Sequence, residues 1–520
     1  MGLRDPVVCI VGAGPAGLVT AHLLRRAGIS FVVLERQEPG GLRARVKAGL
    51  IEHRTVELLR PYGLADPIIS GGGRIGLIEF RADGQVLVLD YAGLCGGRGS
   101  YIYPQHDLVA DWAGQLLAAG GDLRFGVQTT GIEQSGDGAV VSAVRGTEQV
   151  RVQCEAVVVG DGAASALSAG AAAVSATYPT RWLTLIAAAP PSTAGAIYGL
   201  HTRGFAGQFR RSAAMTRFML EIPAGEDYGQ WDDDRIWAEL DQRLAAAGRP
   251  AIQRGELIER DILDHRVRVC DPMQHGRVFL AGDAVHLVIP TGGLGMNTGV
   301  GDAVDLGWKL AATLKGWGGP NLLGSYETER RQVGDRNVAA SRFAAVGRRK
   351  WRSMYRPNIR DNTPEGAKTR DDLIAVAEVE QRKSNEMIGA ELGYRYDGSP
   401  LIAGEGEGPA HDFMSYVPST WPGARLPHVW LKDHTAVQDR IGYGDHYTLL
   451  RFDLQADASG FADAFKAIGA PFKVLDLDDA HAREIYGFGL MLLRPGMHIA
   501  WRGKAAPKDA AKLARMATGH

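Results

Sequence analysis

The sequence predicts a mixed fold, an α/β part followed by α+β parts, and three glycine- and acid-containing segments are the main reason. They lie at residues 8–17, 157–162 and 278–297. Each segment begins with an apolar run typical of a buried strand and continues into a turn or a helical pattern. In open α/β sheets such turns meet at the carboxyl ends of parallel strands, where ligands bind. Three of them in this order predict one large ligand bound across one sheet.

The first segment has the spacing of a dinucleotide-binding turn. The pattern predicts a strand, a helix and a second strand, at 7–11, 15–27 and 31–34. Gly12 permits the tight turn, Gly14 lets the backbone approach a pyrophosphate, and Gly17 lets the helix pack on the strand. The N-terminus of that helix, around Ala16, offers N–H groups to phosphates. Glu35, at the end of the second strand, can accept both hydroxyls of an adenosine ribose, but this segment alone does not separate FAD from NAD.

The second and third segments favour FAD. Asp161 and Asp283 each follow apolar residues, which places each carboxylate at the carboxyl end of a strand. An aspartate there can accept hydrogen bonds from the ribityl hydroxyls of a flavin, although either one alone could be an ordinary helix N-cap. Residues 290–297 form a Pro/Gly-rich turn that opens a helix at 297–314. The dipole of that helix can face the flavin pyrimidine ring, where negative charge collects on reduction.

These motifs resemble those of the group A flavoprotein monooxygenases, the single-component aromatic hydroxylases that include p-hydroxybenzoate, phenol and polyketide hydroxylases. The similarity spans roughly residues 5–345 and includes the pattern Gly-Asp-Ala-x-His-x-x-x-Pro that begins at Gly282. The stretches 35–49 and 271–277 are similar to the p-hydroxybenzoate hydroxylases without a gap, with Lys47 where those enzymes have a second arginine. Together, the motifs and the resemblance predict cofactor contacts at Gly12, Gly14, Ala16, Gly17, Glu35, Arg36, Arg45, Lys47, Gln105, Asp161, Asp283, Gly293, Gly295, Met296 and Asn297.

The resemblance also implies the chemistry. NAD(P)H would reduce FAD, dioxygen would form a flavin C4a-hydroperoxide, and its distal oxygen would pass to a ring carbon ortho or para to a phenol oxygen. The protein would exclude water, orient the ring and assist deprotonation of the phenol. Within the loop at residues 282–297, called the flavin loop, Pro290 is expected to be a catalytic residue, and His286 is expected to be structural.

The resemblance further implies a substrate site in the middle of the chain. Tyr198 is expected to contact the phenol oxygen and Arg211 to bind a substrate carboxylate; the alternatives are a packed strand tyrosine and an ion-paired arginine. Phe209 and Met219 stand among the expected substrate contacts but replace a serine and a tyrosine that help to hold the carboxylate. Ile75 replaces the histidine that ends the family's proton relay. These replacements argue against p-hydroxybenzoate itself and predict a bulkier or less polar phenol.

The electron donor is expected to be NAD(P)H, held transiently and without a second Rossmann fold. Arg266 matches the family's pyrophosphate-contacting arginine. Ala164 and Ser168, however, stand where a histidine and an arginine are expected. The choice between NADH and NADPH therefore stays open.

The order of patterns along the chain predicts the domains. A Rossmann-like FAD-binding domain of the GR2 type takes up 1–75, 100–180 and 265–345, and an antiparallel-sheet substrate domain takes up 76–99 and 181–264. A helical region and linker follow at 346–420. Residues 421–520 read strand, helix, strand, strand pair, helix, an order compatible with a thioredoxin-like fold and similar to the C-terminal domain of phenol and polyketide hydroxylases. Because this domain has no cysteine, we expect it to support structure or dimer formation rather than redox chemistry.

Composition narrows the class of protein. The 520 residues are 45% hydrophobic and 22% charged with a net charge of −1, which indicates no nucleic-acid or membrane partner. The four cysteines are scattered without a C-x-x-C pair, so no metal site or disulfide framework is predicted, and Cys9 and Cys154 are expected to be core residues. Without a signal peptide or an apolar span, we expect a cytoplasmic protein, with small phenolic substrate and O2 as partners, and a homodimer.

Other functions on a similar scaffold stay open. They are a halogenase, a Baeyer–Villiger oxygenase, an antibiotic or polyketide hydroxylase, and a non-enzymatic FAD- or NAD-binding protein. No Trp-x-Trp-x-Ile-Pro segment typical of flavin halogenases is present. The loop at 290–297 and the middle domain argue against a protein that only binds a nucleotide, because binding alone needs neither.

Overall fold

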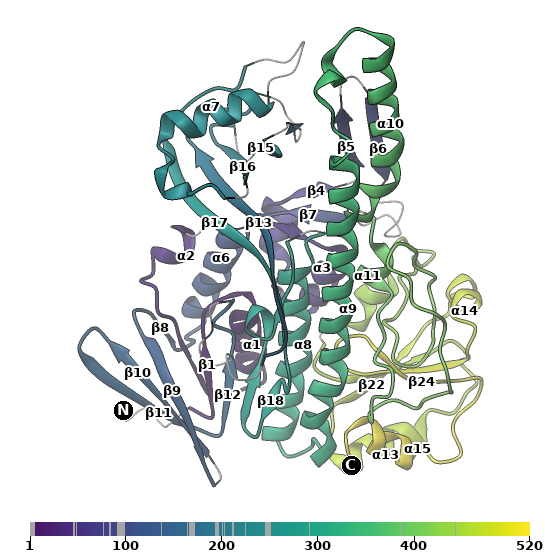
Figure 1. Ribbon diagram of the computed structural model, residues 1–520. Helices are drawn as coiled ribbons and strands as arrows, with labels where there is room; N and C mark the ends of the chain where they lie inside the picture. The colour runs from purple at the N-terminus through teal and green to yellow at the C-terminus, as the bar shows by residue number, and fades with distance from the viewer. Residues whose placement is uncertain are drawn as a thin grey trace.

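Among the described residues, the strands form three larger sheets and three smaller ones (Figure 1). The computed structural model describes residues 6–44, 47, 49–75, 77–82, 85–90, 99–136, 138–163, 165, 172–192, 197–199, 201, 203–210, 213–223, 225–244, 251–290, 292–384, 386–442 and 444–520. In the described part, a largely parallel sheet occupies the lower half, an antiparallel sheet lies above it, and a mixed sheet lies towards the C-terminus.

The parallel sheet is assembled from distant parts of the chain. Its strand order is β18-β19-β12-β1-β2-β8, and only β18 is antiparallel to its neighbour. The strands are β1 (Val8–Val11), β2 (Phe31–Leu34), β8 (Leu123–Arg124), β12 (Ala156–Val159), β18 (Gln274–His275) and β19 (Val278–Leu280). Every residue of β1, β2, β12 and β19 is buried, which explains their continuous apolar sequences. The strands predicted for the three glycine- and acid-containing segments are thus confirmed.

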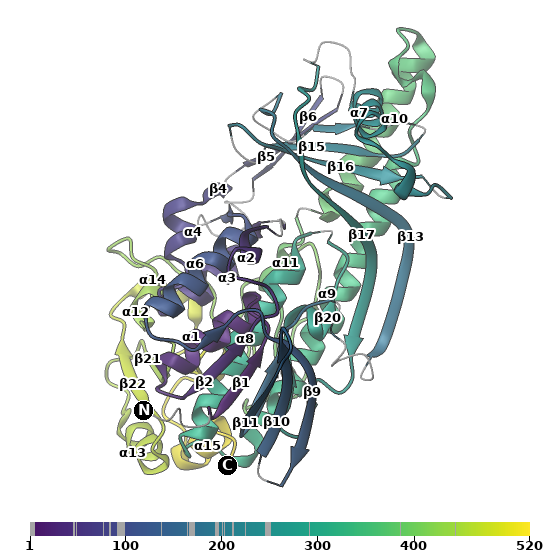
Figure 2. The ribbon, with the colours of Figure 1, turned by 90° about the vertical axis from the view of Figure 1, so that its left-hand side faces the viewer.

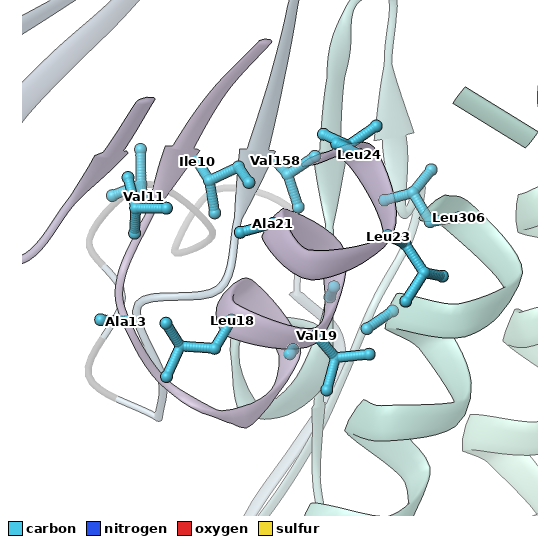
Figure 3. Packing of buried hydrophobic residues seen from close by; sticks show 14 of the residues in the cluster. Ile10, Val11, Ala13, Leu18, Val19, Ala21, Leu23, Leu24, Val158 and Leu306 are labelled. Carbon is cyan, nitrogen blue, oxygen red and sulfur yellow. The ribbon is translucent and has the colours of Figure 1, made fainter. Parts of the chain in front are cut away.

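Helix α1 (Pro15–Arg26) packs between this sheet and helix α8 (Leu294–Leu314) (Figure 3). Leu18, Ala21 and Leu24 of α1 are fully buried. Gly307 of α8 leaves room for Leu23, because a Cβ at that position would lie 2.8 Å from Leu23 Cδ2. The close approach of these two helices brings their N-terminal ends to the same edge of the sheet.

Smaller elements surround the parallel sheet. The helices are α2 (Gly41–Ala44), α3 (His53–Leu59), α4 (Asp66–Gly71) and α6 (Gln105–Ala118). A three-stranded antiparallel sheet contains β9 (Gln128–Ser135), β10 (Gly138–Arg145) and β11 (Glu148–Cys154), and another contains β3 (Leu50–Ile51), β4 (Gly73–Ile75) and β7 (Ser100–Ile102). Strands β5 (Leu77–Ala82) and β6 (Gln85–Asp90) form an antiparallel pair, with Ala82 opposite Gln85.

The antiparallel sheet has the order β14-β15-β16-β13-β17-β20. Its strands are β14 (Ile197–Gly199), β15 (Ala206–Arg210), β16 (Thr216–Ile222), β13 (Ala172–Ala187), β17 (Leu257–Cys270) and β20 (His286–Leu287). Helix α7 (Asp233–Leu244) covers one face, where Phe218 and Leu220 pack with Trp237. Strands β13 and β17 are the longest of this sheet and extend down towards the parallel sheet (Figure 2). The domain borders predicted at 180 and 265 therefore fall inside continuous strands.

The two long helices α8 and α9 (Pro320–Arg352) lie beside the parallel and the antiparallel sheet (Figure 1), and the C-terminal unit packs against them. Helices α10 (Pro364–Glu380) and α11 (Ile388–Leu392) follow α9 in the chain. The C-terminal sheet has the order β22-β21-β23-β24, from β21 (Tyr447–Arg451), β22 (Phe472–Asp476), β23 (Leu490–Leu493) and β24 (Ile499–Gly503). Its helices are α12 (Val437–Ile441), α13 (Ser459–Ile468), α14 (Ala480–Tyr486) and α15 (Ala510–Ala517), of which the sequence prediction lacked α12 and α14.

The burial of the cysteines agrees with the sequence analysis. Cys9 in β1 and Cys154 at the end of β11 are buried, as predicted for core residues, and Cys270 is buried as well. None of the helices among the described residues has the length and apolar character needed to cross a membrane.

Candidate functional site

A cleft of about 340 Å³ lies at the carboxyl edge of the parallel sheet. All three glycine- and acid-containing segments contribute to its lining, together with residues of α6 and the turn after β2. The predicted cofactor residues that line it are Gly12, Gly14, Ala16, Glu35, Arg36, Lys47, Gln105, Asp161, Asp283, Gly295 and Met296. The structure therefore brings together eleven of the predicted cofactor positions in one cleft.

Three further predicted residues do not line the cleft but fix the conformation of the segments that do. A Cβ on Gly17 would lie 2.0 Å from Gly12 O, so only glycine allows α1 to sit this close to the turn. Gly293 precedes α8 with φ of +75°, a conformation that favours glycine. Asn297 donates from Nδ2 to Leu50 O (3.2 Å) and Gly293 O (2.8 Å), which ties the first turn of α8 to β3. Arg45 lies outside the described residues.

The turn between β1 and α1 forms an open backbone cradle. Gly12 has φ of +98°, and a Cβ there would lie 2.7 Å from Gly160 O. The N-cap of α1, Gly14, has no side-chain cap, so the first N–H groups of the helix are available to an anion. The N-terminus of α8 likewise has no side-chain cap, and its residues Gly295 and Met296 line the same cleft. Two helix dipoles therefore favour negative charge at two places in one cleft.

Glu35 also has a structural role, which its motif does not predict. Its Oε2 accepts a hydrogen bond from Ala13 N (2.7 Å) and its Oε1 accepts one from Gln37 N (2.9 Å). The carboxylate thus holds the glycine-rich turn against the end of β2. Each of its oxygens can accept a second hydrogen bond, which leaves acceptor capacity for ribose hydroxyls.

The two aspartates lie in different local environments. Oδ1 of Asp161 is buried without a hydrogen-bond donor among the described residues. Burial raises the pKa of Asp161, and a hydrogen bond with Ser165 and the charge of Arg36 act in the opposite direction. The turn of Asp283 is held through its backbone, because Arg268 Nη2 donates to Asp283 O (3.0 Å) and Ala284 O (3.3 Å).

These features fit FAD. A buried carboxylate oxygen without a donor matches a ligand that carries hydroxyl groups. The backbone cradle, which a Cβ would fill, matches a pyrophosphate, and the N-terminus of α8 matches a ring that gains negative charge.

The predicted substrate residues lie in the antiparallel sheet. Position 198 in β14 is opposite Gly207, and Gly207 is opposite Met219 in β16. Met219 and Phe209 are half-buried, and the alternation of β16 places Met219 on the face opposite to Phe218 and α7. Arg211 lies outside the described residues.

Other predicted residues do not line the cleft. Pro290 is exposed in the flavin loop, and Arg266 is exposed on β17. His286 is buried in β20 with Nε2 3.6 Å from Asp302 Oδ1, a placement that agrees with a structural role. Positions 164 and 168, where the family has a histidine and an arginine, are outside the described residues.

The parallel sheet, the uncapped helix N-termini and the acidic residues at one edge define a dinucleotide-binding protein of the flavoprotein class. Two family models match the chain: "FAD binding domain" over residues 5–341 and "Aromatic-ring hydroxylase, C-terminal" over residues 419–519. The chain therefore belongs to the family of FAD-dependent aromatic-ring hydroxylases, and the resemblance predicted from its motifs is confirmed.

Similar proteins extend over different shares of the chain. Aklavinone 12-hydroxylase RdmE of Streptomyces purpurascens is 30% identical over 97% of this chain and 96% of its own. FAD-dependent monooxygenase apdD of Emericella nidulans is 36% identical, but the match covers 47% of this chain and 41% of that enzyme. A solved complex of aklavinone-11 hydroxylase with FAD and aklavinone is 25% identical, with a TM-score of 0.82 and full coverage of both chains. Flavin-dependent monooxygenase chemistry and FAD binding are thus supported by the family as a whole.

Proposed function

We propose that the protein hydroxylates a phenolic aromatic compound with FAD, NAD(P)H and O2. The observation that carries the proposal is the cleft, in which Asp161 lines the same space as the cradle of α1 and the N-terminus of α8. Bound FAD would supply electron transfer from the nicotinamide and activation of dioxygen. The family membership supports this chemistry over that of a protein that only binds a nucleotide.

In this proposal each part of the cleft has a role toward the cofactor. Glu35 accepts the adenosine ribose hydroxyls, and the N–H groups of α1 bind the pyrophosphate. Asp161 and Asp283 accept hydrogen bonds from the ribityl chain. The N-terminus of α8 stabilises negative charge on the reduced ring.

For the substrate, we propose a fused-ring or otherwise large phenol. Phe209 and Met219 replace polar residues that would help to hold a small carboxylated ring, and both are half-buried in the antiparallel sheet. The full-length similarity to a protein named for aklavinone supports the same size class. Tyr198 is proposed to bind the phenol oxygen and promote its deprotonation, and Arg211 to bind a carboxylate where the substrate has one.

We also propose the domain assignment made from the sequence. The parallel sheet would be the Rossmann-like FAD-binding domain and the antiparallel sheet the substrate domain. In the C-terminal unit, β21 and β22 are parallel, and β23 and β24 are antiparallel additions on the other side of β21. This arrangement supports the thioredoxin-like assignment.

The test is substrate-dependent oxidation of NADH and NADPH by FAD-reconstituted protein. Simple phenols, carboxylated phenols and fused-ring phenols are compared, with ¹⁸O2 and mass spectrometry of the products. We expect slow oxidation without substrate, a rise of about tenfold or more with a suitable phenol, and one labelled oxygen in the product. Equal oxidation rates with and without every phenol, or a product without the label, would contradict the proposal.

A further inference from the structure

Helix α9 makes hydrogen bonds to the residues on both sides of the turn that carries Asp283. The helix lies beside α8 (Figure 1), and three of its side chains bond to β19 and α8, the elements on either side of the Asp283 turn. Tyr326 donates its hydroxyl to Leu280 O at the end of β19 (2.7 Å). Arg330 Nη2 donates to Thr298 O in α8 (3.0 Å), and Asn337 Nδ2 donates to Thr298 Oγ1 (2.7 Å). The two ends of the turn are therefore fixed by one helix that does not itself line the cleft.

Asp302 connects this helix to the turn itself. Its Oδ2 accepts a hydrogen bond from Gly282 N (3.0 Å), and its Oδ1 accepts one from Arg330 Nε (2.7 Å). Gly282 lines the cleft directly before Asp283. Burial alone would raise the pKa of Asp302, but the charges of Arg330 and His286 lower it to about 2, so the carboxylate stays ionised at neutral pH. A charged acceptor holds a backbone N–H more tightly than a neutral one.

The Gly282 backbone has little freedom once this hydrogen bond is made. Gly282 has φ of +65°, and its Cα faces Gly299 of α8, where an added Cβ would lie 3.0 Å away. On the other side, a Cβ on Gly282 would lie 3.2 Å from Ala16 Cβ of α1. The turn is thus confined between α1 and α8, and Asp302 sets where its first N–H points.

The same network continues into the last part of the chain. Arg330 Nη1 donates to the hydroxyl groups of Tyr394 and Tyr396 (both 3.2 Å). Both tyrosine rings stack on His498, with ring centroids 5.5 Å and 4.1 Å away. His498 Nδ1 is 2.9 Å from Gly423 O, within the C-terminal unit. A continuous chain of buried contacts therefore joins residues 421–520 to the turn that carries Asp283.

We propose that Asp302 and Arg330 are positioning residues for the flavin site, and that the C-terminal unit supports FAD binding through the two tyrosines that hold Arg330. The proposal rests on the proposed FAD function. In this proposal the cysteine-free C-terminal unit fixes the position of Arg330. Arg330 in turn holds Asp302, which orients the Gly282–Asp283 backbone.

The test measures FAD binding rather than turnover. Apoprotein of the wild type, Asp302→Asn, Arg330→Gln and the Tyr394→Phe/Tyr396→Phe double variant is titrated with FAD, and flavin fluorescence and the visible spectrum are recorded. We expect FAD Kd to rise by about tenfold to a hundredfold for Asp302→Asn and Arg330→Gln, the range that loss of a hydrogen bond to a charged group produces. The double tyrosine variant should shift Kd in the same direction by a smaller factor, and the spectrum of bound flavin should change in all three.

Glu239→Gln is the matched control for a merely destabilising change. Glu239 and Arg243 form a buried acid–arginine pair in α7 (Arg243 Nη2 to Glu239 Oε2, 2.7 Å), away from the flavin loop. This variant should lower the thermal stability of the apoprotein and leave FAD Kd and the flavin spectrum unchanged. Arg330→Lys, which keeps the charge and loses the fork, should restore part of the affinity lost in Arg330→Gln.

The outcomes separate this inference from the proposed function. A wild-type protein that binds no FAD contradicts the function itself. Wild-type binding with unchanged Kd and spectrum in Asp302→Asn and Arg330→Gln overturns the positioning role alone. If only the double tyrosine variant binds like the wild type, the contribution of the C-terminal unit is overturned and the Asp302–Arg330 pair stands.

Discussion

Replacement of Asp161 by alanine is expected to affect the apoprotein and the FAD complex in opposite directions. In the apoprotein the buried Oδ1 has no donor among the described residues, and an unpaired buried polar group costs about 1–3 kcal/mol. Because Asp161 is partly exposed and Ser165 offsets part of this cost, the lower end applies. We therefore expect Asp161→Ala to raise the free energy of unfolding of the apoprotein by about 1 kcal/mol at pH 7. FAD Kd should rise by about tenfold to a hundredfold, because a charged acceptor for a ribityl hydroxyl is lost.

The pH dependence gives the prediction a second signature. Burial raises the pKa of Asp161 in the folded state, so the folded protein binds the proton more tightly than the unfolded chain. The cost is therefore absent below the ordinary aspartate pKa of about 4 and develops as the pH rises through the folded-state pKa. The stability gain of Asp161→Ala should accordingly disappear towards pH 4.

Urea unfolding of the apoprotein and fluorescence titration with FAD measure the two effects. Asp122→Ala is the control, because both oxygens of Asp122 accept hydrogen bonds from Arg124 (3.0 and 2.7 Å) away from the cleft lining. It should lower apoprotein stability slightly and leave FAD Kd unchanged. The reasoning is refuted if Asp161→Ala destabilises the apoprotein at pH 7 while FAD Kd stays at the wild-type value, since the carboxylate would then be structural.

Four further substitutions test other parts of the structure and the proposal. Tyr198→Phe should retain FAD but lower hydroxylation by roughly 10- to 10⁴-fold, with more reducing equivalents lost as hydrogen peroxide; wild-type rate and coupling would contradict a catalytic tyrosine. Arg211→Ala should raise KM strongly for a carboxylated phenol and little for a neutral one, measured on paired substrates; an equal effect on both would remove its assigned role. Gly17→Ala places a Cβ 2.0 Å from Gly12 O and should yield protein that does not retain FAD, measured by flavin absorbance; yellow protein with wild-type affinity would show that the turn can relax. Arg494→Met removes the guanidinium that pairs with the buried carboxylates of Asp305 and Glu329, and should lower the free energy of unfolding by about 3–5 kcal/mol in urea titrations. Unchanged stability would mean that these two ion pairs contribute little.

The parallel sheet and its cleft could be predicted because their signals are local. Residues 8–11 and 156–159 are short apolar runs with turn residues directly after them, and strands of a parallel sheet buried on both faces need little else. Helices α12 and α14 have five and seven residues, too few for a helical period to stand out, so they were missed.

The positioning pair could not be predicted for a different reason. Asp302 and Arg330 are charged residues on two long helices, and in the sequence nothing distinguishes them from charges on a solvated face. Their pairing appears only when α8 and α9 dock. The hydrogen bonds to Gly282 and Thr298 join residues that are 20 and 32 positions apart in the sequence, so no local pattern indicates them. Helix α8 contains two acids, Asp302 and Asp305, and its sequence does not indicate which of them would pair with an arginine of α9.

The relation between the two sheets bears most directly on the proposed chemistry. Strand β20 (His286–Leu287) follows the Asp283 turn, yet it pairs with β17 as an edge strand of the antiparallel sheet, with Val269 opposite His286. Cys270 N donates to Val285 O (3.0 Å), which extends the connection to within two residues of Asp283. The row that runs from position 198 through Gly207 and Met219 to Thr184 therefore belongs to the same hydrogen-bonded sheet as the flavin loop. A hydroxylase must hold its substrate ring at a fixed distance from the flavin, and one continuous sheet can set that distance without relying on the contact between two separate domains.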